Sequence, residues 1–353
     1  VVGSMMIALQ KGVGRGIFSN EAGLGSAPIA HAAADVDHPI KQGLFGIFEV
    51  FADTLVICTL TSLIILCGNG VENITYGVSA GAELTVAGMS SVFAGLFGTP
   101  LTAALFCMEF ESVGTIFSPA LLPCYIAAFT ASSVSGLLGV HAEGHPLDAA
   151  AALTIENIWL YLLLAILIAV LGIVMVRIFH EAEHLAAHHV KNPWVRIFAG
   201  GVLIAAMTYM VGDHRFNGAG MDMALAAVQG QADWYSFLLK MLFTAVTLAA
   251  GFKGGEIVPT FCIGATFGCV VGGLLGLDAG ICGALGLIGL FCCATNSPLA
   301  SIVLSIEMFG GANLHLFALI CVICFVLSGN TGLYASQVNL FDKASEMIPK
   351  RES

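Results

Sequence analysis

Residues 97–110 read Phe-Gly-Thr-Pro-Leu-Thr-Ala-Ala-Leu-Phe-Cys-Met-Glu-Phe, and residues 295–308 read Thr-Asn-Ser-Pro-Leu-Ala-Ser-Ile-Val-Leu-Ser-Ile-Glu-Met. The two stretches lie 198 positions apart and share a Pro-Leu start and a Glu nine residues past the Pro: Pro100, Leu101 and Glu109, and Pro298, Leu299 and Glu307. This pattern predicts one helix hairpin used twice, the internal symmetry from which many transporters are built. We therefore interpret the chain as a duplicated membrane transport domain.

Composition independently favours a membrane protein. Hydrophobic residues make up 58% of the chain, charged residues only 10%, and the mean hydropathy is +0.94, whereas soluble domains are about one quarter charged. Apolar stretches long enough, or nearly so, to cross a bilayer lie at about 44–68, 86–108, 119–140, 157–179, 194–211, 235–252, 259–276, 279–294 and 314–328. The predicted fold class is an all-α, polytopic membrane protein with tilted or half-crossing helices.

Charge and cysteine content exclude other classes. The net charge of −11 argues against a nucleic-acid partner, and the 11 cysteines sit among apolar neighbours, as buried hydrophobic residues do. Lys and Arg cluster at Arg177–Arg196 and Lys343–Arg351, which the positive-inside rule places in the cytoplasm. Because Val1 is not an initiator Met and no signal peptide precedes the first apolar stretch, we expect an internal fragment of a protein.

The stretch most suggestive of chemistry is Gly251-Phe-Lys-Gly-Gly-Glu-Ile-Val-Pro-Thr-Phe, which runs into the apolar stretch 259–276. Glycines let a ligand approach the backbone, and Pro259 suits a first helical turn. Free N–H groups and the helix dipole at such a start favour an anion. An ordinary interhelical Gly/Pro turn is the alternative.

With these motifs, residues 87–341 resemble the CLC family of chloride channels and anion/proton exchangers. Gly255-Glu256-Ile257-Val258-Pro259 is similar to the family's G-x-F-x-P anion loop, and Tyr334 falls at its late anion-facing tyrosine. The resemblance implies an inverted-repeat domain, a homodimer, and an anion held by the amides of Glu256 and Ile257 and the Tyr334 hydroxyl. Taken alone, Tyr334 is equally an interfacial anchor.

The wider string Gly-Phe-Lys-Gly-Gly-Glu, followed by Ile263-Gly-Ala-Thr, resembles the bacterial branch that includes fluoride exporters, so chloride and fluoride both remain candidate substrates. Glu256 is either part of a proton pathway or a loop carboxylate facing water. The family's inner proton relay falls at Phe110, which cannot carry a proton, and leaves Glu111 as a second coupling candidate. Glu109 and Glu307, each of which closes an apolar helix, are predicted to be helix-end or interface carboxylates.

The first half of the repeat is incomplete. The counterpart of the Pro259 loop should lie near residue 61, but residues 56–64 contain neither Gly nor Pro. The family's gating-glutamate and serine segments occur nowhere in the chain.

The first part of the chain resembles a different family. Lys11-Gly-Val-Gly-Arg-Gly-Ile-Phe-Ser-Asn-Glu-Ala-Gly-Leu-Gly-Ser-Ala-Pro, with His38-Pro-Ile-Lys-Gln-Gly and Asp53-Thr-Leu, is similar to the alanine/glycine:cation symporters over residues 1–85. Asn20, Glu21 and Asp53 are candidates for binding sodium or an amino group, or else cap helix ends.

His180, His184 and His188 fall at i, i+4 and i+8, on one face of a predicted helix. They either hold a divalent metal or form a solvated helix end. Because no apolar shell surrounds them in the sequence, no metal and no cofactor are predicted.

The predicted organisation is a symporter-like membrane fragment over 1–85, a CLC-type anion domain lacking its N-terminal part over 86–341, and a cytoplasmic tail over 342–353. The predicted function is halide transport across a bacterial inner membrane by a protein that is not an enzyme. Sodium-coupled alanine/glycine symport and a non-transporting chimeric fragment are the alternatives.

Overall fold

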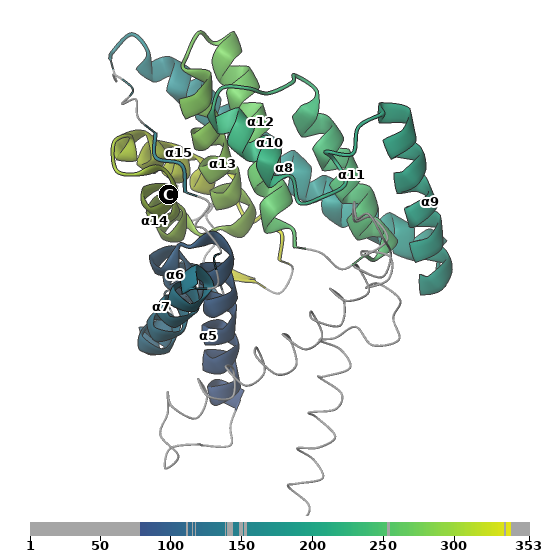
Figure 1. Ribbon diagram of the computed structural model, residues 1–353, viewed down its shortest axis with the longest axis horizontal. Helices are drawn as coiled ribbons and strands as arrows, with labels where there is room; N and C mark the ends of the chain where they lie inside the picture. Colours follow the sequence, from purple (N-terminus) through teal and green to yellow (C-terminus); the bar gives the residue numbers. More distant parts are fainter. Residues whose placement is uncertain are drawn as a thin grey trace, which may run out of the picture. The chain divides into compact units, whose positions relative to one another are not determined.

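A computed structural model describes residues 78–110, 112–114, 116, 118–137, 139, 144–147, 151, 154–252, 255–334 and 337–339. The chain divides into two units, Val1–Leu84 and Thr85–Ser353, and the second unit is the one considered below. Its described part is almost entirely helical (Figure 1), which confirms the all-α part of the predicted fold class. The α-helices are α5 (Val78–Phe97), α6 (Pro100–Phe110), α7 (Leu121–Leu137), α8 (Ile158–His189), α9 (Pro193–Val211), α10 (Met221–Val228), α11 (Ser236–Ala250), α12 (Ile257–Leu274), α13 (Ala279–Thr295), α14 (Pro298–Phe309) and α15 (Leu314–Leu327).

The predicted hairpin repeat is visible in the backbone. Between α5 and α6, Gly98 has φ of 68°, and 198 positions later Asn296, between α13 and α14, has φ of 57°. Each residue donates its N–H to the carbonyl four residues before it, at 2.9 and 3.0 Å. The apolar stretch 86–108 was therefore wrongly predicted as a single span, because Gly98 turns the chain and Pro100 starts a new helix.

The two repeated glutamates cap each other's helices. The Glu109 carboxylate, near the end of α6, accepts the N–H groups of Leu299 and Ala300 at 3.1 and 2.8 Å, in the first turn of α14. The Glu307 carboxylate, near the end of α14, accepts those of Leu101 and Thr102 at 3.0 and 2.8 Å, in the first turn of α6. The prediction of helix-end carboxylates is confirmed, and the exchange requires α6 and α14 to lie antiparallel, side by side (Figure 1).

Glycines bring α12 and α13 into close contact. A Cβ on Gly264 would collide with the carbonyl oxygen of Gly286, and a Cβ on Gly268 with that of Cys282. Because lower numbers on α12 meet higher numbers on α13, the two helices run antiparallel. Small residues at such spacing are how helices approach closely in membranes, where dispersion rather than water exclusion stabilises packing.

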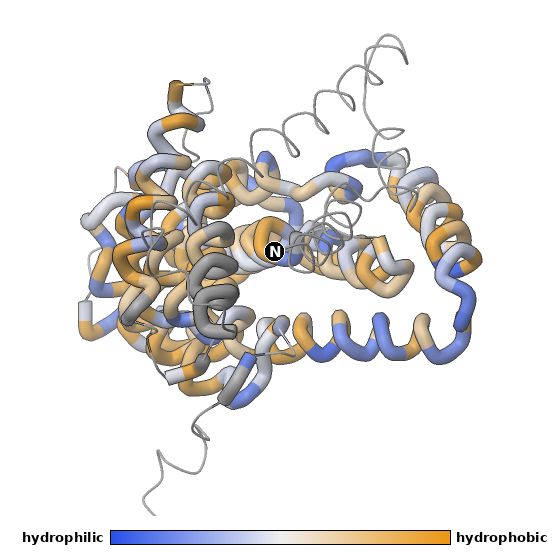
Figure 2. Tube along the Cα trace, turned by 90° about the horizontal axis from the view of Figure 1, so that it is seen from below, coloured by the Kyte–Doolittle hydropathy of each residue, from blue (hydrophilic) through white to orange (hydrophobic). Residues whose placement is uncertain are grey.

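Three of the described helices, α8, α9 and α12, are long and apolar enough to cross a membrane, and several shorter apolar helices accompany them. Figure 2 shows hydrophobic residues along most of the coloured trace, with hydrophilic residues gathered at helix ends and connections. The cysteines in the described residues are buried, as predicted, and none of these forms a disulfide with another. The sequence prediction missed α10, an eight-residue helix too short to stand out as an apolar stretch.

A short parallel pairing joins two distant segments of the chain. Strand β1 (Ser112–Val113), just after α6, pairs with β2 (Val338–Asn339), near the end of the described chain. The pairing brings the end of the first hairpin next to the segment that carries Tyr334.

Candidate functional site

The start of α12 presents backbone N–H groups that find no acceptor in the described part of the chain. Glu256 occupies the N-cap position, but its carboxylate makes no capping hydrogen bond, and Thr260 turns both its N–H and its hydroxyl to the Glu256 carbonyl oxygen, at 3.1 and 2.7 Å. Among the described residues, the N–H groups of Ile257 and Val258 find no acceptor. Pro259 has no N–H to satisfy. Together with the helix dipole, this helix start has the arrangement that binds anions.

A cation that the sequence prediction did not single out lies beside the preceding loop. Gly251 ends α11 with φ of 87°, and a Cβ built on it would lie 3.3 Å from Nη2 of Arg196, near the start of α9. The Nε atom of Arg196 is buried and has no hydrogen-bond partner within the described residues. Its spacing from Gly251 in the sequence gives no sign of this contact.

The segment that carries Tyr334 is fixed mainly by the end of α13. Leu333 donates its N–H to the Ala294 carbonyl oxygen at 2.8 Å. The side-chain amide of Gln337 donates to the Thr295 carbonyl oxygen at 3.0 Å. The Asn296 amide donates to Thr331 O and to Gln337 Oε1, each at 3.1 Å. Asn296 and Gln337 are therefore positioning residues for Tyr334 that sequence patterns did not indicate.

Helix α8 holds the same segment from another side. The Nε2 atom of His180 lies 3.0 Å from the carbonyl oxygen of Leu333, the residue before Tyr334. The C-terminal part of α8 therefore lies beside the segment after α15, and the start of α9 lies beside the end of α11.

Electrostatics also link the predicted site residues. Burial, and then the charge of Glu256, raises the pKa of Tyr334. Burial likewise raises the pKa of Glu256; the negative charge of Glu183 raises it further, and His180 lowers it. The structure therefore brings Glu256 and Tyr334 within electrostatic reach of each other, while the anion-binding role of Gly255, Glu256, Ile257, Pro259 and Tyr334 stays a prediction.

Several predicted site residues lie outside the described part of the chain, and the three histidines of α8 do not come together as a metal site. Glu111, Asn20, Glu21 and Asp53, and the expected loop counterpart near residue 61, lie outside the described residues. Among the residues that are described, no group of three His, Cys, Asp or Glu side chains comes together as a metal site, so His180, His184 and His188 form none.

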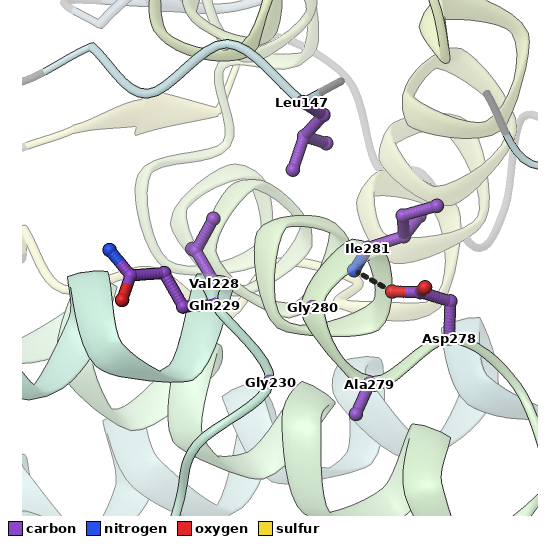
Figure 3. Close-up of a pocket in the computed structure, with 8 residues that line it drawn as sticks. All are labelled: Leu147, Val228, Gln229, Gly230, Asp278, Ala279, Gly280 and Ile281. Atoms are coloured by element: carbon purple, nitrogen blue, oxygen red, sulfur yellow. Dashed lines mark hydrogen bonds between the residues drawn. The ribbon is translucent and has the colours of Figure 1, made fainter. Parts of the chain in front are cut away.

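A separate cavity of about 410 Å³ lies where α10 ends and α13 begins (Figure 3). Its carboxylate, Asp278, is occupied as the N-cap of α13 and accepts the Ile281 N–H at 2.8 Å. Because α12 and α13 are antiparallel, the cavity lies at the opposite end of α12 from Glu256.

The chain is similar in sequence to known families of membrane proteins. The model of the voltage gated chloride channel family matches residues 62–329, which include the hairpin repeat and the start of α12. The chain belongs to this family. A chloride/fluoride channel protein of Pseudomonas syringae pv. tomato is 33% identical over 260 residues, which are 72% of this chain and 58% of the relative. The chain thus spans somewhat more than half the length of that CLC relative.

Solved structures of CLC proteins match the fold of this chain. A CLC-type fluoride/proton antiporter matches with a TM-score of 0.73 and 30% identity, covering 80% of this chain and 72% of that chain. A slow cyanobacterial Cl⁻/H⁺ antiporter matches in fold, with a TM-score of 0.60 and 17% identity over 77% of this chain and 66% of its own. These relatives and the apolar helices make the chain an integral membrane protein.

A second family model, the sodium:alanine symporter family, matches residues 1–121 and overlaps the CLC match over 62–121. A probable sodium/glutamine symporter of Bacillus subtilis is 55% identical over 89 residues, which are 25% of this chain but only 18% of the relative. The symporter match is thus longer than the predicted 1–85. The overlap contains α6, whose Glu109 and Pro100 belong to the hairpin repeat.

Proposed function

We propose that the chain transports small halide anions, chloride or fluoride, across a membrane, with the anion held at the start of α12. The observation that carries the proposal is the pair of N–H groups at Ile257 and Val258, which find no acceptor among the described residues, at a helix start whose N-cap, Glu256, is within electrostatic reach of Tyr334. A dehydrated halide needs several donors and no competing anion, and backbone amides with a tyrosine hydroxyl supply donors without a counter-charge.

Glu256 is the proposed coupling residue, with Glu111 as the second candidate. A half-buried carboxylate at an anion site repels the anion when ionised and ceases to do so when protonated. The raised pKa of Glu256 supports a protonation change during transport. Gly255 and Pro259 shape the loop and the first helical turn around the anion.

The test is halide efflux from liposomes that contain the purified chain. Tyr334→Phe keeps the ring and removes only the hydroxyl, and we expect it to slow fluoride or chloride efflux about tenfold, the usual effect of losing one hydrogen bond to a charged ligand. Tyr209→Phe, at an exposed tyrosine of α9, is the matched control and should leave efflux unchanged. Equal efflux from the wild-type chain and Tyr334→Phe would reject the proposed site.

Sodium-coupled alanine or glycine symport is the second candidate, favoured by the symporter-family match over residues 1–121. Asn20, Glu21 and Asp53 are its proposed sodium or substrate residues. Alanine uptake that requires a sodium gradient and is lost in Asp53→Asn would favour it. If folded protein shows no halide efflux and no alanine uptake, the result would favour the third alternative, a non-transporting chimera.

We further propose that the chain lies in a bacterial inner membrane, because the matched CLC relative is bacterial. We also propose that it forms a homodimer, as the resemblance to the CLC family implies. Two leucines at equivalent repeat positions, Leu101 in the first turn of α6 and Leu299 in the first turn of α14, are 39% and 48% exposed, and a dimer contact through these helices would cover apolar surface. Cysteine crosslinking at Leu299 in native membranes tests the contact; monomer alone at saturating oxidant would argue against it.

A further inference from the structure

Helix α9 presents an apolar face to its surroundings. Among the three described helices that are long enough to cross a membrane, it is the least buried: 17% of its apolar stretch is buried in the protein, against 50% for α8 and 61% for α12. It lies at an edge of the described unit and packs mainly on α11 (Figure 1). Large side chains along it, among them Phe198, Val202 and Tyr209, are exposed. In a bilayer this face meets lipid.

The first turn of α9 lies at the depth of the lipid headgroups. The helix begins at Pro193, directly after the exposed Lys191 and within the Lys and Arg cluster that the positive-inside rule places in the cytoplasm. Trp194 is 60% exposed there, and exposed tryptophans of membrane helices favour the boundary between hydrocarbon and headgroups. The start of α9 therefore faces the headgroups of the cytoplasmic leaflet.

Arg196, in this first turn, is a cation without an anion among the described residues. Its Nη2 and Nε atoms both face Gly251, and Nε is buried there without an acceptor. Because the guanidinium is planar, Nη1 points away from that contact. Within the described residues, the ion pairs of an arginine belong to Arg215, beyond the other end of α9. The charge of Arg196 is thus left to a ligand from outside the protein.

The surroundings of Arg196 favour an anionic group. Residues 190–211 contain neither Asp nor Glu, and Lys191 adds a second positive charge. The N–H of Val195 finds no acceptor in the described part of the chain. Phosphate oxygens match the arginine fork, and the exposed apolar side chains farther along α9 suit acyl chains, which a free anion does not have.

We propose that the start of α9 binds the phosphate of an anionic phospholipid of the cytoplasmic leaflet. The Nη groups of Arg196 donate to the phosphate oxygens, Lys191 supplies further positive charge, and the acyl chains lie along Phe198 and Val202. Since Arg196 also contacts Gly251, the bound lipid holds the start of α9 against the end of α11. This site is separate from the candidate anion site and does not depend on the proposed function.

The experiment is native mass spectrometry of the whole chain, stripped of lipid in detergent and titrated with phosphatidylglycerol or with phosphatidylcholine. We expect phosphatidylglycerol to bind more tightly, because the choline cation offsets the phosphate charge beside Arg196 and Lys191. Arg196→Gln should weaken phosphatidylglycerol binding about tenfold, the effect of losing hydrogen bonds to a charged group. Lys191→Gln should weaken it about fivefold, the usual contribution of one basic side chain at an anionic surface.

Arg177→Gln is the matched control. It removes the same charge from an exposed position on α8, about 18 Å along that helix before its end, and should leave the affinity unchanged. Equal wild-type affinity for the two lipids, or equal losses in Arg177→Gln and Arg196→Gln, would overturn the site in favour of a diffuse basic surface. Displacement of the lipid by millimolar inorganic phosphate would overturn the choice of a lipid. If Arg196→Gln does not fold, the exposed Lys191→Gln decides, and wild-type affinity in that variant would reject the proposal.

Discussion

At the scale of single residues, the exchanged caps of Glu109 and Glu307 show how a carboxylate is accommodated among apolar helices. Each ion accepts two backbone N–H groups that would otherwise lack partners, in a place where water cannot replace them. Glu307 has a third partner, the Thr102 hydroxyl at 2.6 Å, for which the other copy has no equivalent because Ala300 stands there.

Replacing Glu109 with Gln should destabilise the protein. The amide keeps one acceptor oxygen but presents N–H₂ to a backbone donor, so one N–H of α14 stays unpaired, at a loss of about 1–2 kcal/mol. Thermal unfolding in detergent measures this as a lower midpoint, with Glu156→Gln at an exposed position as control. An unchanged midpoint in Glu109→Gln would mean that the caps contribute little.

Glu256 should make stability depend on pH. Burial, and then the charge of Glu183, raises its pKa in the folded state, so the folded protein binds this proton more tightly than the unfolded chain does. Its contribution is complete below the unfolded-state pKa of about 4.3 and is lost as pH rises through the folded-state pKa. The unfolding midpoint of the wild type should therefore fall over that interval relative to Glu256→Gln; parallel curves would contradict the assignment.

At the scale of helices, the contact between α12 and α13 tolerates no side chain at Gly268. An alanine Cβ there would collide with the Cys282 carbonyl oxygen and lie 2.9 Å from the Cα of Gly286, both of them backbone atoms that cannot rotate away. We expect Gly268→Ala to destabilise the protein by about 1–3 kcal/mol.

Gly273→Ala is the matched control on the same helix. Its Cβ would meet only the Cβ of Ala279, at 3.9 Å, which is an ordinary contact. Alanine also favours the helix over glycine, so this variant should unfold at the wild-type temperature or above. Equal losses in both variants would show that the glycines matter for some reason other than helix contact.

The segment after α15 depends on Asn296 for its position. Asn296→Gly keeps the left-handed backbone and removes the side-chain amide, which holds Thr331 and Gln337 and also accepts the Ser328 hydroxyl at 3.4 Å. We expect faster hydrogen exchange at the Leu333 amide and slower halide efflux, with little loss of stability. Asn296→Ala should add a stability loss of about 1 kcal/mol, because alanine disfavours positive φ. Wild-type exchange in Asn296→Gly would show that the amide does not hold the segment.

At the scale of the whole molecule, the sequence predicted what is local and repeated. Pro100, Pro298 and the two glutamates marked the hairpins, and the Gly-rich turn before Ile257 marked the start of α12. The partner of each carboxylate could not be predicted, because spacing along the chain does not say that α6 and α14 lie antiparallel. The same holds for His180, whose helical face was predicted but whose contact with Leu333 joins residues 153 positions apart.

The exchanged caps also impose an order in time. Glu307 lies 206 residues after Leu101, and at about 5–20 residues per second a ribosome needs roughly 10–40 s to make that stretch. For that interval the first turn of α6 is already synthesised while the carboxylate that satisfies its N–H groups does not yet exist. Bare amides are strongly disfavoured in hydrocarbon, so α6 must wait at the polar surface of the bilayer or beside the insertion machinery, and the first hairpin settles only when the second arrives.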